Sequence, residues 1–464
     1  MLGVLLTIVA IWLFVYKSYY YSLLIFCGLI TLGFLVIPPA VLLYGAPVEK
    51  TSDLAIFYIL AIIVSHYKSI LHAIYNERLF RWVLIFIGFV TLDAIYSYEV
   101  LGYDMVGVIK VFRHYLFFFS FGVFILVPYQ ILVKLLHTIA VITVVQSILY
   151  LLQIPTGVIL LGDADNVVIN NMEQIGWVRY YNTPQYLLPS VFYFLFIYKY
   201  KSKVIHWFIV GVLLATVVAP MHRSYMLTVT LVVSTYIIFR QSNSKKTIYI
   251  SLLVLVGYGA LLIGPINSRL NEGLNDISKT FAPGRSLASI DYRTEDTFAY
   301  RMAHLFERVN YIQQKSARLV FGVGLLSEDT KQAEELRFEA GLYSRRLDRI
   351  AQVETGDIAW SLLILHLGFI GTGLFIIMNI YFLKLFFHYR SVPTSVLGLL
   401  SLSVTLLISF TGTELLMIHF RVFILLIFVM ALKENKLMCA KNLIRSNEDV
   451  KDLSPRITQT INLA

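Results

Sequence analysis

The fold of this chain is decided by the stretch from Arg301 to Gly371. It begins Arg301-Met-Ala-His-Leu-Phe-Glu-Arg-Val-Asn-Tyr-Ile312 and passes through Phe321-Gly-Val-Gly-Leu325. At Thr355-Gly-Asp-Ile-Ala-Trp360 it enters an apolar run that carries Gly368 and Gly371. The stretch contains most of the long hydrophilic segment of a chain that is otherwise dominated by apolar runs. Any chemistry is therefore predicted where this segment meets a membrane.

The composition is that of a polytopic membrane protein. Of the 464 residues, 58% are hydrophobic and 14% are charged, whereas a soluble domain carries roughly 25% charged residues. The mean hydropathy is +0.74. A net charge of +10 could indicate a nucleic-acid partner. We interpret it instead as topological, because Lys and Arg gather in the cytoplasmic loops of membrane proteins.

Thirteen apolar runs are long enough, or nearly so, to cross a hydrocarbon layer of about 30 Å. When these runs alternate in direction, the basic connections fall on one side, which the positive-inside rule makes cytoplasmic. The prediction is an all-α, polytopic helical bundle of about 12–13 spans. The predicted spans cover 2–16, 21–43, 54–66, 81–97, 106–127, 132–152, 184–198, 204–219, 225–240, 247–265, 357–385, 393–410 and 415–433.

This topology divides the chain into four parts. Ten spans lie in residues 1–265, a large external loop in 266–356, three spans in 357–433 and a cytoplasmic tail in 434–464. The two cysteines, Cys27 in an apolar run and Cys439 in the tail, are not expected to form a disulfide.

The external loop is too long for a bare connection, so it is expected to be structured. Over 301–312 the apolar residues recur at helical spacing, with charged residues on the opposite side. A second helix is predicted from Asp329, with Asp329 as its N-cap and Gln332 three residues later. The two helices would either lie on the membrane surface and cap the bundle, or face a substrate.

Three arginines lie on the predicted external side, close to where the chain enters the membrane. Arg223 stands in Pro220-Met-His-Arg-Ser-Tyr-Met-Leu227 beside His222, Arg301 opens the amphipathic helix, and Arg179 precedes the seventh span. Because the guanidinium fork matches phosphate oxygens, these residues could converge on a pyrophosphate. The alternatives are an arginine that snorkels to lipid headgroups, or one that is solvated or salt-bridged.

A carboxylate marks the point where the long segment re-enters the membrane. Asp357 stands at the external mouth of the eleventh span, and Glu354 precedes it by about one helical turn. A carboxylate at this boundary can accept the proton of a hydroxyl as a general base. The alternative is a helix N-cap, a position that Asp fills well.

Ionisable residues also occur inside predicted spans, where they should face a cavity or one another. Lys110 and Arg113 lie in the fifth span and Asp93 in the fourth. They could form a structural pair between Asp93 and Lys110 or Arg113, or a cationic groove that receives a lipid phosphate. A weaker set of the same kind lies near the last span: Glu414, His419 and Arg421.

The sequence lacks several motifs that are typical of proteins that use ATP or a nucleotide sugar. There is no Gly-rich Walker loop, no paired-Cys motif, no His-Glu-x-x-His and no Asp-x-Asp signature of nucleotide-sugar enzymes. ATP-driven work and a nucleotide-sugar donor are therefore disfavoured. An activated donor that already resides in the membrane is favoured instead.

In these residues the chain resembles the O-antigen polymerase and O-antigen ligase superfamily, which acts on lipid-linked glycans. Arg223-Ser-Tyr-Met-Leu227 matches its Arg-x-x-x-Leu motif, and Arg301 followed by Phe321-Gly-Val-Gly-Leu325 is similar to its Arg-headed helix and Gly-x-Gly turn. Gly368-Phe-Ile-Gly371 matches its Gly-x-x-Gly element. Eleven residues before Gly368, where ligases carry His followed by Asn, Ser or Gln, this chain has Asp357 and Ile358. This departure favours the polymerase, or Wzy-type, branch.

The resemblance implies a GT-C-like architecture and a metal-independent glycosyltransferase without a cofactor, in a bacterial inner membrane. Donor and acceptor glycans on undecaprenyl pyrophosphate would be joined at the periplasmic face into O-antigen, capsule or exopolysaccharide; a chain-length regulator could be a further partner. Arg223 and Arg301 would hold the pyrophosphate, and Asp357 would take the acceptor proton. The remaining residues considered for substrate binding are Arg179, Lys110, Arg113, His222 and Glu354.

Two other functions stay open at this point. A ligase would transfer the finished glycan to lipid A core or to protein. A transporter or flippase for a lipid-linked sugar would use Lys110, Arg113 and Asp93 as its pathway, but it would be expected to show repeat symmetry and paired broken helices. The sequence shows neither.

Overall fold

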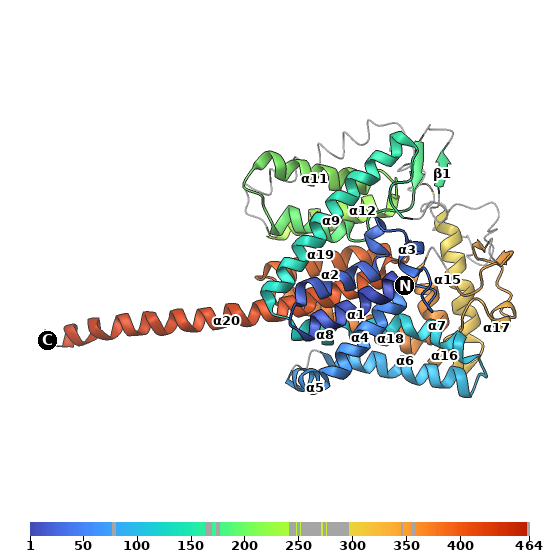
Figure 1. Ribbon diagram of the computed structural model, residues 1–464, viewed down its shortest axis with the longest axis horizontal. Helices are drawn as coiled ribbons and strands as arrows, with labels where there is room; N and C mark the ends of the chain where they lie inside the picture. Colours follow the sequence, from blue (N-terminus) through green and yellow to red (C-terminus); the bar gives the residue numbers. More distant parts are fainter. Residues whose placement is uncertain are drawn as a thin grey trace.

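The protein is described by a computed structural model that covers residues 1–76, 80–162, 169–172, 177–240, 297–344, 347–354 and 358–461, with isolated residues at 247, 251, 271 and 275. The described chain is mostly helical, with two short antiparallel hairpins. In Figure 1, helices α15, α16 and α17 lie at one end of the bundle, and α20 leaves from the opposite end. We call the end that carries α15, α16 and α17 the capped end.

The first half of the chain forms the helices α1 (Leu2–Val15), α2 (Tyr19–Ile30), η1 (Gly33–Leu35), α3 (Pro39–Leu43), α4 (Thr51–Ser65), α5 (Tyr67–Asn76), α6 (Arg81–Glu99), α7 (Met105–Leu116), η3 (Phe117–Phe119), α8 (Ser120–Leu126) and α9 (Tyr129–Thr156). The hairpin of β1 (Ile169–Met172) and β2 (Trp177–Tyr180) follows, with Asn170 opposite Arg179. Next come α10 (Leu187–Phe192), η6 (Tyr193–Ile197), α11 (Lys203–Val218) and α12 (Arg223–Arg240).

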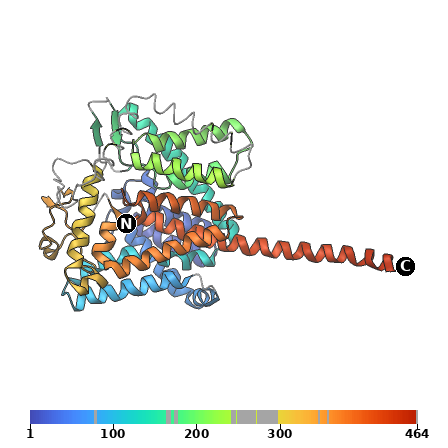
Figure 2. The same cartoon turned by 180° about the vertical axis from the view of Figure 1, so that it is seen from behind.

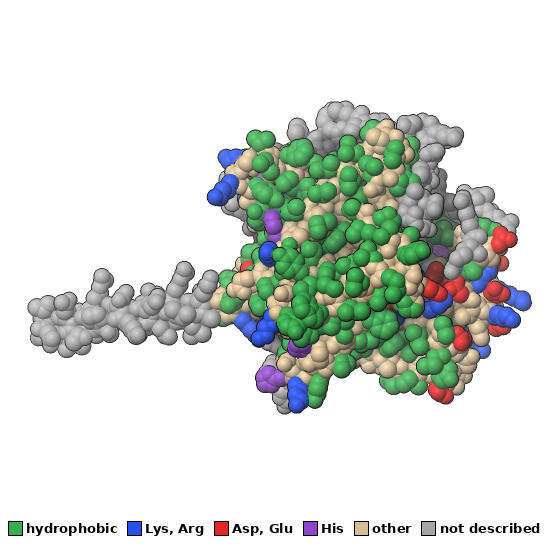
Figure 3. Space-filling model, viewed as in Figure 1, with side chains coloured by type: hydrophobic (Ala, Val, Ile, Leu, Met, Phe, Trp, Pro, Cys, Tyr) green, Lys and Arg blue, Asp and Glu red, His purple; other side chains and the backbone are tan. Residues whose placement is uncertain are grey.

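The second half begins with α15 (Thr297–Gln313), α16 (Ser316–Phe321) and α17 (Lys331–Glu334). The hairpin of β3 (Tyr343–Ser344) and β4 (Arg349–Ile350) leads to α18 (Ala359–His388), α19 (Pro393–Ile408), η8 (Glu414–Leu416) and α20 (Ile418–Ile461). In Figures 1 and 2, α9, α11 and α12 form a layer beside the main bundle. Figure 3 shows hydrophobic side chains over the visible face between the two ends, and acidic side chains at the capped end.

The structure has the expected all-α architecture, with helices that are long and apolar enough to cross a membrane. Among the described residues there are four, namely α6, Met105–Leu126, α9 and α18, and a bent pair of α4 and α5 adds a fifth if it counts as one span. Six further apolar helices have only 10–17 residues. At 1.5 Å per residue, such helices fall short of a layer of about 30 Å.

Two predicted spans need comment. The run 21–43 is not one span, because α2 ends at Ile30 and the backbone turns left-handed at Leu32 and Phe34, with φ of 52° and 57°. The prediction of a continuous helix there is wrong, since apolarity alone does not reveal such a break. The predicted span 247–265 lies almost wholly outside the described residues.

The predicted helix over 301–312 is confirmed as α15, which starts slightly earlier, at Thr297. The second loop helix was predicted less well, because α17 has only four residues and its N-cap is Thr330 and not Asp329. The carboxylate of Asp329 instead lies 3.8 Å from the ammonium of Lys110 on α7. A long-range ion pair has therefore replaced the local cap.

Three glycines hold the loop helices against the membrane helices, and we call them the glycine interlock: Gly322, Gly324 and Gly368. All three have positive φ, of 64°, 78° and 61°. The turn between α16 and α17 touches α18 where Gly368 interrupts its helical geometry, and the amide of Val323 donates to the Leu365 carbonyl at 2.7 Å. A Cβ on Gly322 would overlap that carbonyl oxygen.

The interlock also reaches α6. A Cβ on Gly324 would lie 2.5 Å from the Ser97 hydroxyl, which accepts a hydrogen bond from the Leu325 amide at 2.8 Å. Gly371 is constrained in a similar way, because its Cβ would overlap the ring of Phe89. At the Gly-x-Gly and Gly-x-x-Gly motifs the turn and α18 thus approach backbone to backbone, and side chains of α6 pack against both.

The interlock predicts opposite effects for two alanine substitutions within α18. Gly368→Ala should lower the free energy of unfolding by about 2 kcal/mol or more, because a left-handed alanine is strained and its Cβ would lie 2.7 Å from the Arg318 carbonyl oxygen. Gly373→Ala is the matched control: nothing lies within 4 Å of its Cβ, so a gain of about 0.5–1 kcal/mol is expected. Unfolding midpoints of the purified protein test this, and equal midpoints would contradict it.

Candidate functional site

Two polar hollows open at the capped end, on either side of the segment that joins α19 to α20. The smaller has a volume of about 300 Å³ and is lined by Glu414, so we call it the Glu414 pocket. The larger, of about 670 Å³, extends between α7, the 326–329 segment and the start of α20, and we call it the larger cleft. Met417 lines both.

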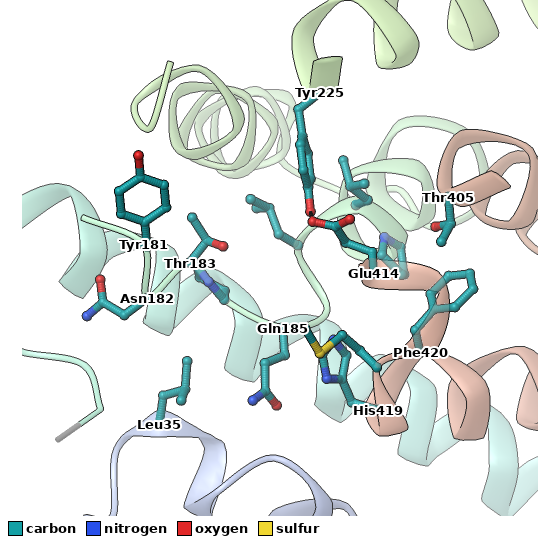
Figure 4. Close-up of a pocket in the computed structure, with 15 residues that line it drawn as sticks. Leu35, Tyr181, Asn182, Thr183, Gln185, Tyr225, Thr405, Glu414, His419 and Phe420 are labelled. Carbon is teal, nitrogen blue, oxygen red and sulfur yellow. Dashed lines mark hydrogen bonds between the residues drawn. The ribbon is translucent and has the colours of Figure 1, made fainter. Parts of the chain in front are cut away.

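The Glu414 pocket is built around a carboxyl on η8. The hydroxyl of Tyr225, in the first turn of α12, donates a hydrogen bond to Oε1 of Glu414 (Figure 4). The second oxygen, Oε2, is buried without a hydrogen-bond partner among the described residues, and the same holds for the amide oxygen of Gln185. Figure 4 shows Gln185, Asn182 and Thr183 around the same space. The pocket thus presents unused polar atoms to a ligand.

Arg301 is the predicted arginine that lies near this carboxyl. Burial raises the pKa of Glu414 above its usual 4.5, while the hydrogen bond from Tyr225 and the positive charge of Arg301 oppose that rise. Glu414 can therefore hold its proton to a higher pH than a solvated Glu, and it sits beside a cation. Such a carboxyl can exchange a proton with a bound hydroxyl.

The start of α18 meets the same region. The amide of Ala359 donates to the carbonyl oxygens of Ser409 and Gly412, at 3.2 and 3.1 Å. One turn into α18, the Ser361 hydroxyl lies 3.0 Å from Nδ1 of His304 on α15. Burial and the charge of Arg308 lower the pKa of His304 to about 3, so its imidazole is neutral at physiological pH. These bonds join α15, α18 and the 409–414 turn.

Other predicted residues of the arginine group are only partly described. Arg223 is the first residue of α12, two positions before Tyr225, and Arg179 lies on β2. The structure describes the backbone of both residues but not their side chains. The ring of His222 lies 5.4 Å from Tyr181 and 5.5 Å from Tyr225, beside the Glu414 pocket. Asp357 lies outside the described residues.

The predicted intramembrane cations line the larger cleft instead. The ammonium of Lys110 lies 3.7 Å from a carboxylate oxygen of Glu49, and Arg113 is 2.7 Å from Asp53. Of the two alternatives left open for these cations, the structural pair with Asp93 is wrong. Asp93 is fully buried on α6, and its carboxyl oxygens have no hydrogen-bond partner within the described chain. Lys110 pairs with Glu49, in the connection between α3 and α4, and Arg113 pairs with Asp53 on α4. These carboxylates are distant in the sequence, so the pairs could not be predicted from sequence proximity.

Glu354 also lines the larger cleft, where it is exposed. The predicted site residues therefore fall into two groups, with Arg301 and His222 near the Glu414 pocket and Lys110, Arg113 and Glu354 in the larger cleft. Sequence reasoning gave too little weight to Glu414 and Arg421, and it overlooked Tyr225. The sequence did contain a signal for two of these residues: Glu414 is an acidic residue between the last two predicted spans, and Tyr225 lies inside the Arg-x-x-x-Leu motif.

Comparison with known proteins adds no assignment: no known family model matches the chain, and no curated protein matches its sequence. Within the described ranges, no group of three or more His, Cys, Asp or Glu side chains is arranged to hold a metal ion. Metal independence remains a prediction of the resemblance.

The buried carboxyl predicts a pH dependence of stability. Because the folded-state pKa of Glu414 is raised above 4.5, its stabilising contribution is complete below that pH and is lost as the pH rises through the folded pKa. Wild-type melting temperature should therefore fall relative to that of Glu414→Gln over this range. Tyr225→Phe, which removes the hydrogen-bond donor, should move the loss to higher pH.

The control is Glu354→Gln, which neutralises an exposed carboxylate of the larger cleft. Its melting temperature should follow the wild-type pH profile. If Glu414→Gln and Glu354→Gln give the same profile, Glu414 does not titrate as described.

Proposed function

We propose that the protein is a membrane glycosyltransferase that polymerises oligosaccharide repeat units carried on undecaprenyl pyrophosphate into a surface polysaccharide. The observation that carries the proposal is the meeting, at the capped end, of Arg301, the start of α12 that bears Arg223, and the half-buried Glu414–Tyr225 pair. In this proposal the capped end faces the periplasm and the tail of α20 the cytoplasm. The described helices would then belong to a GT-C-like bundle in the inner membrane.

The reaction would need two contributions from these residues, namely stabilisation of the leaving group and removal of a proton. The acceptor hydroxyl attacks the anomeric carbon of the donor glycan, and the bond from that carbon to the pyrophosphate oxygen breaks. The guanidinium groups of the arginines would stabilise the negative charge that develops on the leaving pyrophosphate. A carboxylate would take the proton of the acceptor hydroxyl. Asp357 is the residue predicted for that role, and Glu414 is the described carboxyl best placed to share it.

Two further features support a reaction between two lipid-linked substrates. The Glu414 pocket and the larger cleft lie on either side of one segment and share Met417, so donor and acceptor could approach from different sides. The motif glycines bring the loop helices onto α18 and α6, which keeps Arg301 near the membrane helices. A ligase would use the same arginines, so product analysis must separate the two reactions.

The polymerase proposal predicts that site variants leave single repeat units on the lipid carrier. Arg301→Gln, Arg223→Gln and Asp357→Asn should each reduce polymer formation by about 100-fold or more, the loss typical of removing one preorganised charge-stabilising group. Glycan chain length in cells that carry each variant is the measurement. Arg390→Gln, at an exposed arginine just beyond the far end of α18, is the control and should give wild-type chain lengths.

Other outcomes point to the alternatives. Undiminished long chains that remain unattached would indicate a ligase. Substrate that is trapped on the cytoplasmic side would indicate a flippase. Normal chain length in all three variants would refute a role for this site in the transfer.

A further inference from the structure

Arg421, in the first turn of α20, is a buried cation without an anionic partner. Its side chain is 6% exposed, and its Nη1 donates to the His114 carbonyl oxygen at 2.8 Å. The guanidinium lies 5.2 Å from the ring of Tyr115, and its Nε has no hydrogen-bond partner among the described residues. No carboxylate of the described chain lies within salt-bridge distance of it.

Two other arginines at the capped end that are buried or half-buried do have a carboxylate partner. Arg308 lies 2.8 Å from Glu307, and Arg113 lies 2.7 Å from Asp53. A buried charge without a partner is strongly unfavourable unless something else supplies the counter-charge. Arg421 is buried, lines the larger cleft and lacks such a partner, so a bound anion can supply its counter-charge there.

The surroundings of Arg421 can hold such an anion together with a larger body. Arg421 lines the larger cleft, whose volume of about 670 Å³ lies within the range of about 300–1,000 Å³ found for small-molecule sites. A lone inorganic anion would leave most of this space unfilled. Lys50, Lys110 and Arg113 line the same cleft, where Lys110 pairs with Glu49 and Asp329, and Arg113 pairs with Asp53.

The buried acidic group of the cleft, Glu328, is already engaged. Glu328 accepts hydrogen bonds from the amides of Gln352, Val353 and Glu354, at 3.0, 2.6 and 3.0 Å. It also lies 3.6 Å from Arg349. The carboxylate of Glu328 therefore stabilises the 350–354 segment and is not directed at Arg421. Hydroxyls of Ser327, Ser344 and Thr413 complete the lining and suit a hydroxyl-rich ligand.

We infer that the larger cleft binds a saccharide through an oxyanion, a sugar carboxylate or a phosphate, whose oxygens accept hydrogen bonds from the Arg421 guanidinium. The saccharide part of this statement rests on the proposed function, whereas the oxyanion follows from Arg421 itself. Lys110 and Lys50 would steer the anion inward from the mouth of the cleft. The bound anion would supply the counter-charge that the protein lacks.

The test measures binding to the purified full-length chain in lipid nanodiscs, without any polymerisation assay. Three probes are compared by calorimetry: a tetrasaccharide of alternating glucuronate and N-acetylglucosamine, the same tetrasaccharide with its carboxyls reduced to alcohols, and inorganic pyrophosphate. The acidic tetrasaccharide or pyrophosphate should bind at least about 10-fold more tightly than the reduced tetrasaccharide, because charge-assisted hydrogen bonds to arginine are among the strong ones. Which of the two binds identifies the source of the oxyanion.

Arg421→Gln should weaken that binding by about 10–100-fold. Arg390→Gln is the matched control, because Arg390 also donates to a carbonyl oxygen and stacks on an aromatic ring, at the far end of α18. Leu342→Trp, at an exposed position that lines the cleft, should block binding without altering the core, which keeps the test valid if Arg421→Gln does not fold.

The inference would be overturned if neither anionic probe bound more tightly than the reduced tetrasaccharide. Unchanged binding in Arg421→Gln and Leu342→Trp would also overturn it. In that case Arg421 only joins α20 to α7 through the His114 carbonyl. Since no polymer is formed in this assay, its result is independent of the cellular chain-length experiment.

Discussion

The close backbone contact between the Gly322–Gly324 turn and α18 at Gly368 is the constraint on which the rest of the capped end depends. Only residues without a Cβ allow the Val323 amide to reach the Leu365 carbonyl while the Leu325 amide reaches Ser97 on α6. The contact ties a polar segment to two apolar helices. It thereby keeps α15, with Arg301, against the membrane helices and next to Glu414.

Charge at the capped end follows a simple physical rule. Most ionisable groups that leave water there find an opposite charge or a set of backbone donors, as Arg113 does with Asp53 and Glu328 does with the 352–354 amides. Several charged groups also retain a buried polar atom without a hydrogen-bond partner in the described chain, and Glu414 and Arg421 are two of them. Incomplete satisfaction of a buried polar group is tolerated where a ligand can complete it. Glu414 and Arg421 line the two adjoining hollows.

Sequence reasoning succeeded where the signal was local and failed where the partner was distant in the chain. The spacing of apolar residues over 301–312 is a property of a single helix, and α15 confirms it. The Asp329 cap was wrong because Asp329 pairs with Lys110, and the alternative of an Asp93 ion pair was wrong because Lys110 and Arg113 pair with Glu49 and Asp53. Local rules cannot rank such competing partners.

The sequence by itself determined that this is a helical membrane protein with a structured polar segment, because hydrophobic length, helical periodicity and glycine turns are local properties of the chain. It also drew attention to Arg301 and to both glycine motifs. Only the tertiary structure decided that Arg301 lies near Glu414 and that Lys110 and Arg113 line a separate cleft. It alone showed that Arg421 is buried without a carboxylate, because the partners of a buried charge are set by which helices pack together.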